Sequence, residues 1–145
     1  MKPENQFRSS VHRYIDPQLV HHEKMSNPYR AGGADDWYSG KPDPRRGSSR
    51  DLWIEWKFIT VPVRAETVID LVNGKKPLLT PLQQLWLRER YDEGRNVAVG
   101  IGCSKGGVLL WGTTWETPMT AAEFRGWMQP REELALAITD FVRGF

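Results

Sequence analysis

Glu55 and Lys57 are the two residues whose types and spacing first suggest chemistry. They lie in residues 51–59 (DLWIEWKFI), which alternate in character as a strand does. Side chains two residues apart on a strand point the same way, so the carboxylate and the ammonium group would share one face with Trp53. As a half-exposed ion pair they would contribute at most about 1 kcal/mol. The alternative is that they form part of an active site.

A second carboxylate on a neighbouring strand would give this pair a chemical use. Asp35 or Asp36, in the short strand predicted for residues 35–40, could supply it. Mg²⁺ prefers oxygen ligands and keeps several waters, so two carboxylates and phosphate oxygens suffice to bind it. Such an ion lowers the pKa of a bound water and offsets charge on a reacting phosphate. Lys57 would then orient the water or stabilise the developing charge.

The elements that must position these residues can be predicted from periodicity. Apolar residues at helical spacing predict an amphipathic helix over residues 4–15, after Pro3. Prolines and a Gly-Gly pair predict a loop over residues 16–34, and a polar loop should separate the two strands. An extended piece could continue through residue 63.

The second half of the sequence predicts further helices and strands. The clearest helix is residues 80–94, with Thr80 as N-cap, Pro81 at the first position and Gly94 at the end. Beyond it we expect two buried strands and then two helices. The other segments are a short helix or turn at 64–76, the strands at 96–103 and 106–112, and the helices at 120–128 and 130–145. This order predicts a single mixed α/β domain spanning residues 1–145.

Composition sets broad limits on function. The chain has 145 residues, 39% hydrophobic and 26% charged, which suits one packed domain. A net charge of +2 does not by itself indicate a nucleic-acid binder. Cys103 is the only cysteine, which excludes an intrachain disulfide and fits a cytoplasmic protein. No apolar run is long enough to span a membrane, and the N-terminus lacks the apolar segment of a signal peptide.

The motifs GGADDWYSG, DLWIEWKFI and LLTPLQQLWLRERYDEG together resemble the PD-(D/E)XK nucleases. The resemblance covers residues 4–110 and is greatest to the small stand-alone VRR-NUC-type nucleases of phages and bacteria. It implies a restriction-endonuclease-like core, a mixed β-sheet flanked by helices in αβββαβ order. That core would span about residues 4–112, and residues 118–145 would form a helical extension.

The resemblance also implies roles for individual residues. Asp35 and Glu55 would bind the metal, Lys57 would act on the water or the transition state, and Gln83 would complete the site. Glu4 would be the glutamate of the first helix.

The sequence departs from the family at the aspartate. The family usually has Gly-x-Pro-Asp, whereas Ala34 precedes Asp35 here. Asp36, and Asp43 after Pro42, are therefore alternatives to Asp35.

The function implied is that of a deoxyribonuclease dependent on Mg²⁺ or Mn²⁺. It would recognise branched DNA, such as a Holliday junction, rather than a base sequence. It would act as a homodimer, in the host cytoplasm if a phage encodes it. The basic residues between the two strands would contact DNA, or would simply be solvated: Lys41, Arg45, Arg46 and Arg50.

Two other classes of function remain open. One is a module on a nuclease-like fold that binds DNA or protein without cutting. The other is a small interaction protein that uses some of its seven tryptophans to bind a partner. His12, His21 and His22 show no metal-binding spacing, and we expect them to be solvated. The apolar content of residues 118–145 suggests a dimer surface.

Overall fold

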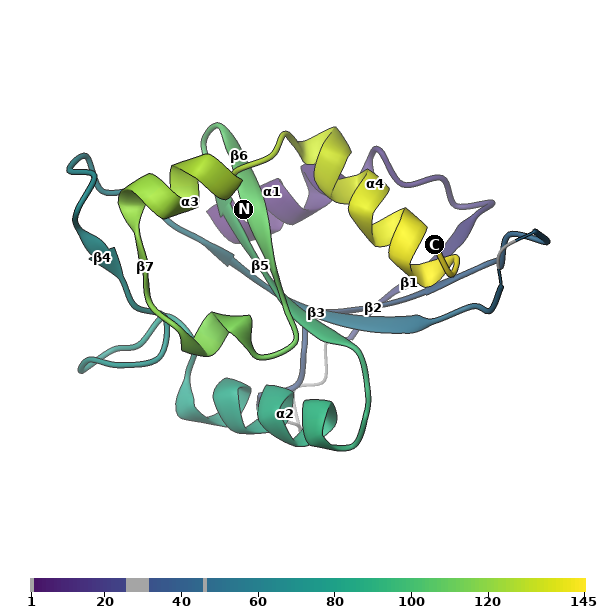
Figure 1. The fold of residues 1–145 in the computed structure, drawn as a ribbon, viewed down its shortest axis with the longest axis horizontal. Coiled ribbons are helices and arrows are strands. Elements are labelled where there is room, and N and C mark those ends of the chain that lie inside the picture. Colours follow the sequence, from purple (N-terminus) through teal and green to yellow (C-terminus); the bar gives the residue numbers. More distant parts are fainter. Residues whose placement is uncertain (1, 26–31, 46) are drawn as a thin grey trace.

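The computed structural model describes residues 2–25, 32–45 and 47–145. At its centre is a five-stranded mixed sheet with the strand order β1-β2-β3-β5-β6 (Figure 1). The β3–β5 pair is parallel, and the other neighbouring pairs are antiparallel. The strands are β1 (Val20–Lys24), β2 (Asp36–Gly40), β3 (Asp51–Phe58), β5 (Val97–Cys103) and β6 (Gly106–Trp111). A small second sheet pairs β4 (Val68–Ile69) with β7 (Met119–Thr120).

Helices cover both faces of the central sheet. On one face lie α1 (Pro3–His12) and α4 (Arg131–Val142), which also pack against each other. The other face is covered by α2 (Pro81–Asp92), the 3₁₀ turn η1 (Thr114–Glu116) and α3 (Ala121–Trp127). In the part of the chain that the structure describes, no helix combines the length and the apolar character needed to cross a membrane.

The alternation of β3 is the reason that the site residues share a face. Its even-numbered residues Leu52, Ile54 and Trp56 are buried in the core beneath α1 and α4. Its odd-numbered residues Glu55 and Lys57 therefore point to the side covered by α2.

The order of the first six main elements, α1-β1-β2-β3-α2-β5, is the predicted αβββαβ order once the two-residue β4 is set aside. Differences occur at the edges. The first helix ends at His12 rather than at residue 15, and β1 lies inside the segment predicted to be a loop. Residues 60–63 form no strand, and the segment predicted as a short helix or turn contains a turn at residues 65–66 and the two-residue strand β4.

The C-terminal helix belongs to the core of the domain. Four apolar side chains of α4 are completely buried against α1, β2 and β6: Leu134, Ala135, Ile138 and Val142. Leu136 of the same helix, by contrast, is 51% exposed. The apolar character of the four buried residues is accounted for by packing within the chain, so it gives no support to a dimer surface, which stays a prediction for the exposed residues of 118–145.

Candidate metal and active site

The pairing of β2 with β3 places Asp35 opposite Glu55. Asp36 pairs with Ile54 in this antiparallel ladder, so extending the register by one residue brings Asp35 across from Glu55. Oδ2 of Asp35 accepts a hydrogen bond of 2.8 Å from the backbone N–H of Trp56, which fixes the carboxylate against β3. Glu55 is buried, with 2% of its surface exposed. Two carboxylates thus meet at one point of the sheet.

Two side chains contact the same oxygen of Glu55. Nε2 of Gln83 donates a hydrogen bond of 2.5 Å to Oε1, and Nζ of Lys57 lies 3.7 Å from that atom. The other oxygen, Oε2, is buried and accepts no hydrogen bond from any residue in the described ranges, although Glu55 and Asp35 can share a proton when one of the two is protonated. A buried carboxylate oxygen without a donor is costly, and coordination of a cation is one way to satisfy it.

The electrostatics of Glu55 agree with this geometry. The pKa of Glu55 is raised to about 9, first because the group is buried and second because Asp35 is negatively charged. Lys57 acts in the opposite direction, and Glu4, in the first turn of α1, adds a smaller upward contribution. Two carboxylates that disfavour each other's charge fit a divalent cation, since its charge would stabilise both.

Gln83 is positioned by the start of α2. Thr80 is the N-cap, and its hydroxyl oxygen accepts a hydrogen bond from the backbone N–H of Gln83 at 3.2 Å. In return, Oε1 of Gln83 accepts a hydrogen bond from the backbone N–H of Thr80 at 3.0 Å. This reciprocal capping box leaves Nε2 directed at Glu55. From the TPLQ motif we predicted Gln83 in the site and Thr80 at the N-cap, but not that the Gln83 side chain would also close a capping box.

The two alternative aspartates lie elsewhere. Asp36 has no exposed surface, and its side chain lies on the α1 side of the sheet, where it pairs with Arg8 and His22. Asp43 is in the turn that follows β2, and it accepts a hydrogen bond of 2.8 Å from the backbone N–H of Arg45. Asp35 is the aspartate that the structure places beside Glu55.

The basic loop lies at the other end of the β2–β3 hairpin. The five residues of β2, at about 3.4 Å each, separate Asp35 from this loop by about 17 Å. The loop contacts the C-terminus of α4, because Arg50 donates its backbone N–H to the Val142 carbonyl and Arg143 donates to the Lys41 carbonyl. It therefore does not lie beside the carboxylates.

The side chains of this loop also have partners of their own. The Arg50 guanidinium lies over the Phe141 ring, and Arg45 lies 3.5 Å from the Asp43 carboxylate. Arg46 is outside the described residues. DNA contact by Lys41, Arg45, Arg46 and Arg50 stays a prediction, and it would concern DNA some distance from the carboxylates.

A cavity of about 590 Å³ is lined in part by residues that neighbour Asp35 and Glu55 in the chain. Its walls include Gly33 and Ala34, which directly precede Asp35, and Trp53, which lies two residues before Glu55 on the same strand. Trp86 of α2 forms another wall, with its ring centroid 5.6 Å from that of Trp53. Asp35, Glu55, Lys57 and Gln83 are not among its lining residues, so the cavity borders the segments that carry the carboxylates rather than the carboxylates themselves.

Comparison with known proteins supports the fold. Neither a family model nor a curated protein sequence matches the chain. The solved structure of Hjc, a Holliday junction resolvase from the archaeal hyperthermophile Archaeoglobus fulgidus, is similar with a TM-score of 0.50 and 11% sequence identity. The alignment covers 92% of this chain and 98% of that one. The domain thus has the predicted restriction-endonuclease-like fold, a mixed sheet flanked by helices.

Proposed function

We propose that this protein is a divalent-metal-dependent deoxyribonuclease that cuts branched DNA. The observation that carries the proposal is the arrangement at Glu55. One of its buried oxygens faces Gln83 and Lys57, and the other accepts no hydrogen bond from a described residue. An ordinary surface ion pair does not account for a carboxylate that is buried, half satisfied and next to a second carboxylate.

Each residue has a defined part in this proposal. Asp35 and Glu55 hold Mg²⁺ or Mn²⁺, which when bound supplies a water of lowered pKa and offsets charge on the phosphate. Lys57 orients the attacking water or stabilises the negative charge of the transition state. Gln83 holds Glu55 in place through its amide. Glu4 lies near enough to influence Glu55 and would assist at the edge of the site.

The preference for branched DNA rests on the similarity to Hjc, which is a Holliday junction resolvase. The finer assignment to VRR-NUC-type nucleases rests on the sequence motifs. A four-way junction has two strands to cut, so a two-fold dimer with one site in each subunit suits it. We include a homodimer in the proposal for this reason.

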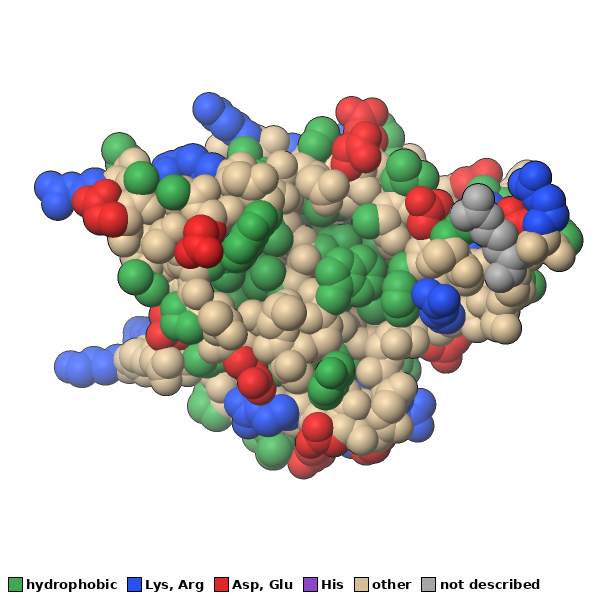
Figure 2. Space-filling model, viewed as in Figure 1, with side chains coloured by type: hydrophobic (Ala, Val, Ile, Leu, Met, Phe, Trp, Pro, Cys, Tyr) green, Lys and Arg blue, Asp and Glu red, His purple; other side chains and the backbone are tan. Residues whose placement is uncertain are grey.

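The exposed apolar surface suggests where such a dimer could form. Figure 2 shows apolar side chains gathered in the middle of one face, with charged side chains mostly around them. A cavity of about 540 Å³ on β6, α3 and α4 is lined in part by Leu109, Trp111 and Trp127. Trp127 is 49% exposed. If this surface joins two subunits, Trp127→Asp will halve the mass measured by light scattering, whereas an unchanged dimer mass would place the interface elsewhere.

The experiment that tests the proposed activity is a cleavage assay on labelled single-stranded, duplex, flap and four-way-junction DNA in Mg²⁺ and in Mn²⁺. Wild type should cut the branched DNAs fastest, and Lys57→Ala should abolish cutting. The exposed Lys75 provides the control, because Lys75→Ala removes the same charge elsewhere. If folded wild-type protein cuts none of these DNAs in either metal, the binding-module alternative replaces the nuclease.

A further inference from the structure

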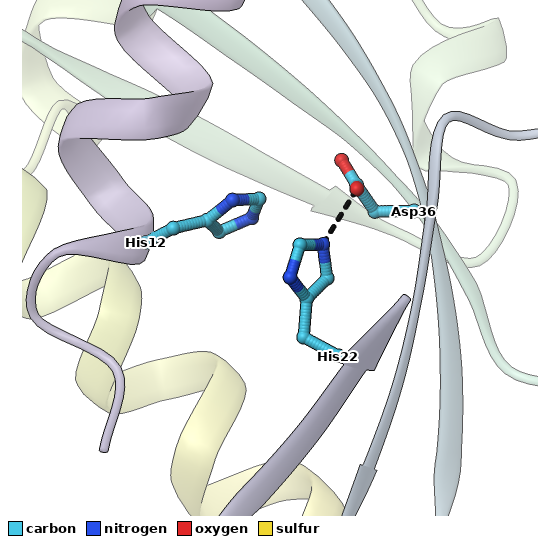
Figure 3. Close-up of side chains that lie close together, drawn as sticks. All are labelled: His12, His22 and Asp36. Carbon is cyan, nitrogen blue, oxygen red and sulfur yellow. Dashed lines mark hydrogen bonds and ion pairs between the residues drawn. The ribbon is translucent and has the colours of Figure 1, made fainter. Parts of the chain in front are cut away.

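A second group of metal-binding side chains lies on the other face of the sheet. It consists of His12 at the end of α1, His22 in β1 and Asp36 in β2, and we name it the His12–His22–Asp36 cluster. One potential ligand atom from each residue lies within 4.8 Å of the other two. Figure 3 shows the two imidazoles and the carboxylate converging from these three elements.

The cluster is not the solvated set of histidines that the sequence suggested. The imidazole centroids of His12 and His22 are 4.1 Å apart, and Nε2 of His22 lies 2.6 Å from Oδ1 of Asp36. The His22 side chain is only 29% exposed, and Asp36 is completely buried. His21, by contrast, is 61% exposed and contacts Glu23. Only two of the three histidines therefore belong to the cluster.

The protonation state of His12 suits a metal ligand. Its pKa is lowered to about 4, chiefly because the ring is buried and secondly because His22 lies beside it. His12 is therefore neutral at physiological pH, and neutral imidazole is the form that binds transition metals. Its Nε2 shares a hydrogen bond of 2.6 Å with the Tyr38 hydroxyl, which orients the ring.

Arg8 determines which ions the cluster could hold. Its guanidinium pairs with Oδ2 of Asp36, and Nη2 donates to Oδ1 at 3.2 Å. Hydrogen bonds of this kind orient a ligating carboxylate, but the positive charge opposes a cation. A hard ion such as Mg²⁺, which depends on anionic oxygens, is disfavoured here. Zn²⁺ and similar late first-row ions bond strongly to imidazole and can tolerate that charge.

Size and access also fit an ion of this class. Zinc–nitrogen bonds of about 2.0–2.1 Å put tetrahedral ligand atoms about 3.4 Å apart, so the cluster needs only modest side-chain movement to close. A hollow of about 450 Å³ opens onto the imidazoles between Ile15, Pro17 and Val20. It provides a path for the ion and room for a water as the fourth ligand.

We propose that His12, His22 and Asp36 bind a Zn²⁺-class ion, separate from the catalytic metal, that joins α1 to the β1–β2 hairpin. Asp36 directly follows Asp35, and α1 also carries Glu4. An ion at the cluster would therefore fix two of the elements that position the candidate active site. The site itself does not depend on the proposed nuclease activity, because its ligands lie on the opposite face of the sheet.

The test uses Co²⁺, which absorbs visible light when nitrogen and oxygen ligands surround it, as a spectroscopic substitute for Zn²⁺. In chelator-treated full-length protein, the visible Co²⁺ band should saturate at one equivalent, and Zn²⁺ should abolish it. Zn²⁺ should also raise the melting temperature, because it binds the folded state. Both effects should be lost in His12→Asn and in His22→Asn.

Two control variants separate the cluster from its surroundings. His21→Asn removes the exposed neighbouring imidazole, and Glu55→Gln disables the proposed catalytic metal site; both should keep the Co²⁺ band. The proposal is overturned if wild type gives no band, if both cluster variants keep it, or if His21→Asn or Glu55→Gln loses it. Because no DNA is cut in this experiment, its result is independent of the nuclease assay.

Discussion

Gln83 donates a hydrogen bond of 2.5 Å from its side-chain amide to the carboxylate of Glu55. The other end of the same amide accepts a hydrogen bond from the backbone of Thr80 and closes the capping box of α2. One side chain therefore ties the start of a helix to a buried carboxylate on the sheet. Neither end of the amide can turn without breaking one of these bonds.

This double use predicts different results for two substitutions at the start of α2. Gln83→Ala removes the hydrogen bond to Glu55, so we expect DNA cleavage to fall at least tenfold and to need more Mg²⁺. Thr80→Ala should lower the free energy of unfolding by about 0.5–2 kcal/mol through the lost cap, but should keep most of the activity. Equal activity losses in both variants, measured across a Mg²⁺ titration, would contradict a direct role for the amide.

The raised pKa of Glu55 predicts a pH-dependent stability in the metal-free protein. The folded-state pKa of about 9 exceeds the ordinary value of 4.5, so folding strengthens proton binding at this group. The resulting stabilisation is complete below about pH 4.5 and is lost as the pH rises through about 9. Chemical denaturation in EDTA should therefore show stability falling over this range.

Glu55→Gln isolates this effect, because it replaces the carboxyl group with a neutral group of similar shape. The difference in unfolding free energy between wild type and this variant should change with pH in the direction just given. Mg²⁺ must displace the proton, so its affinity for wild type should rise with pH. A difference that stays constant from pH 5 to 9 would show that Glu55 is already ionised in the folded protein.

The sequence was sufficient to predict the parts of the fold and the site that local patterns encode. Alternation in residues 51–59 predicts β3 and the common face of Glu55 and Lys57, and the Thr80–Pro81 start predicts α2. In contrast, β1 (VHHEK) has few apolar residues and gains its conformation from pairing with β2, so local composition did not reveal it.

Local sequence patterns also could not predict which residues far apart in the chain would come into contact. His12 and His22 are separated by the turn after α1, and Asp36 comes from another strand, so no spacing rule joins them. The choice between Asp35 and Asp36 as the metal ligand also depended on contacts with residues far away in the sequence. Only the position of Arg8 and the β2–β3 register distinguish the two carboxylates.

Asp35 and Asp36, although adjacent, should respond differently to the same substitution. Asp35→Asn should abolish cleavage with little loss of stability, because the side chain lies beside Glu55 and not in the core. Asp36→Asn leaves the Arg8 guanidinium buried without its counter-charge and should destabilise the fold by about 3–5 kcal/mol. Thermal melts and cleavage assays on both variants separate the two effects. Full activity in Asp35→Asn would move the metal ligand to another residue.

Substitution of Gly100 would test whether the core beneath the site depends on close packing of the Trp56 ring. The two residues are paired across β3 and β5, and a Cβ added at Gly100 would overlap the Trp56 ring. Overpacking of this kind usually costs about 1–3 kcal/mol. Trp56 also donates its backbone N–H to Asp35, so a displaced ring should disturb the carboxylate as well.

We therefore expect Gly100→Ala to lower both the melting temperature and the cleavage rate. Gly126→Ala is the matched control, because Gly126 lies in α3 and an added Cβ there meets no atom within 4 Å. That substitution should stabilise the helix by about 0.5–1 kcal/mol and leave cleavage unchanged. If Gly100→Ala melts like wild type, Trp56 has room to move. The position of Asp35 would then depend on the β2–β3 register rather than on the packing of this ring.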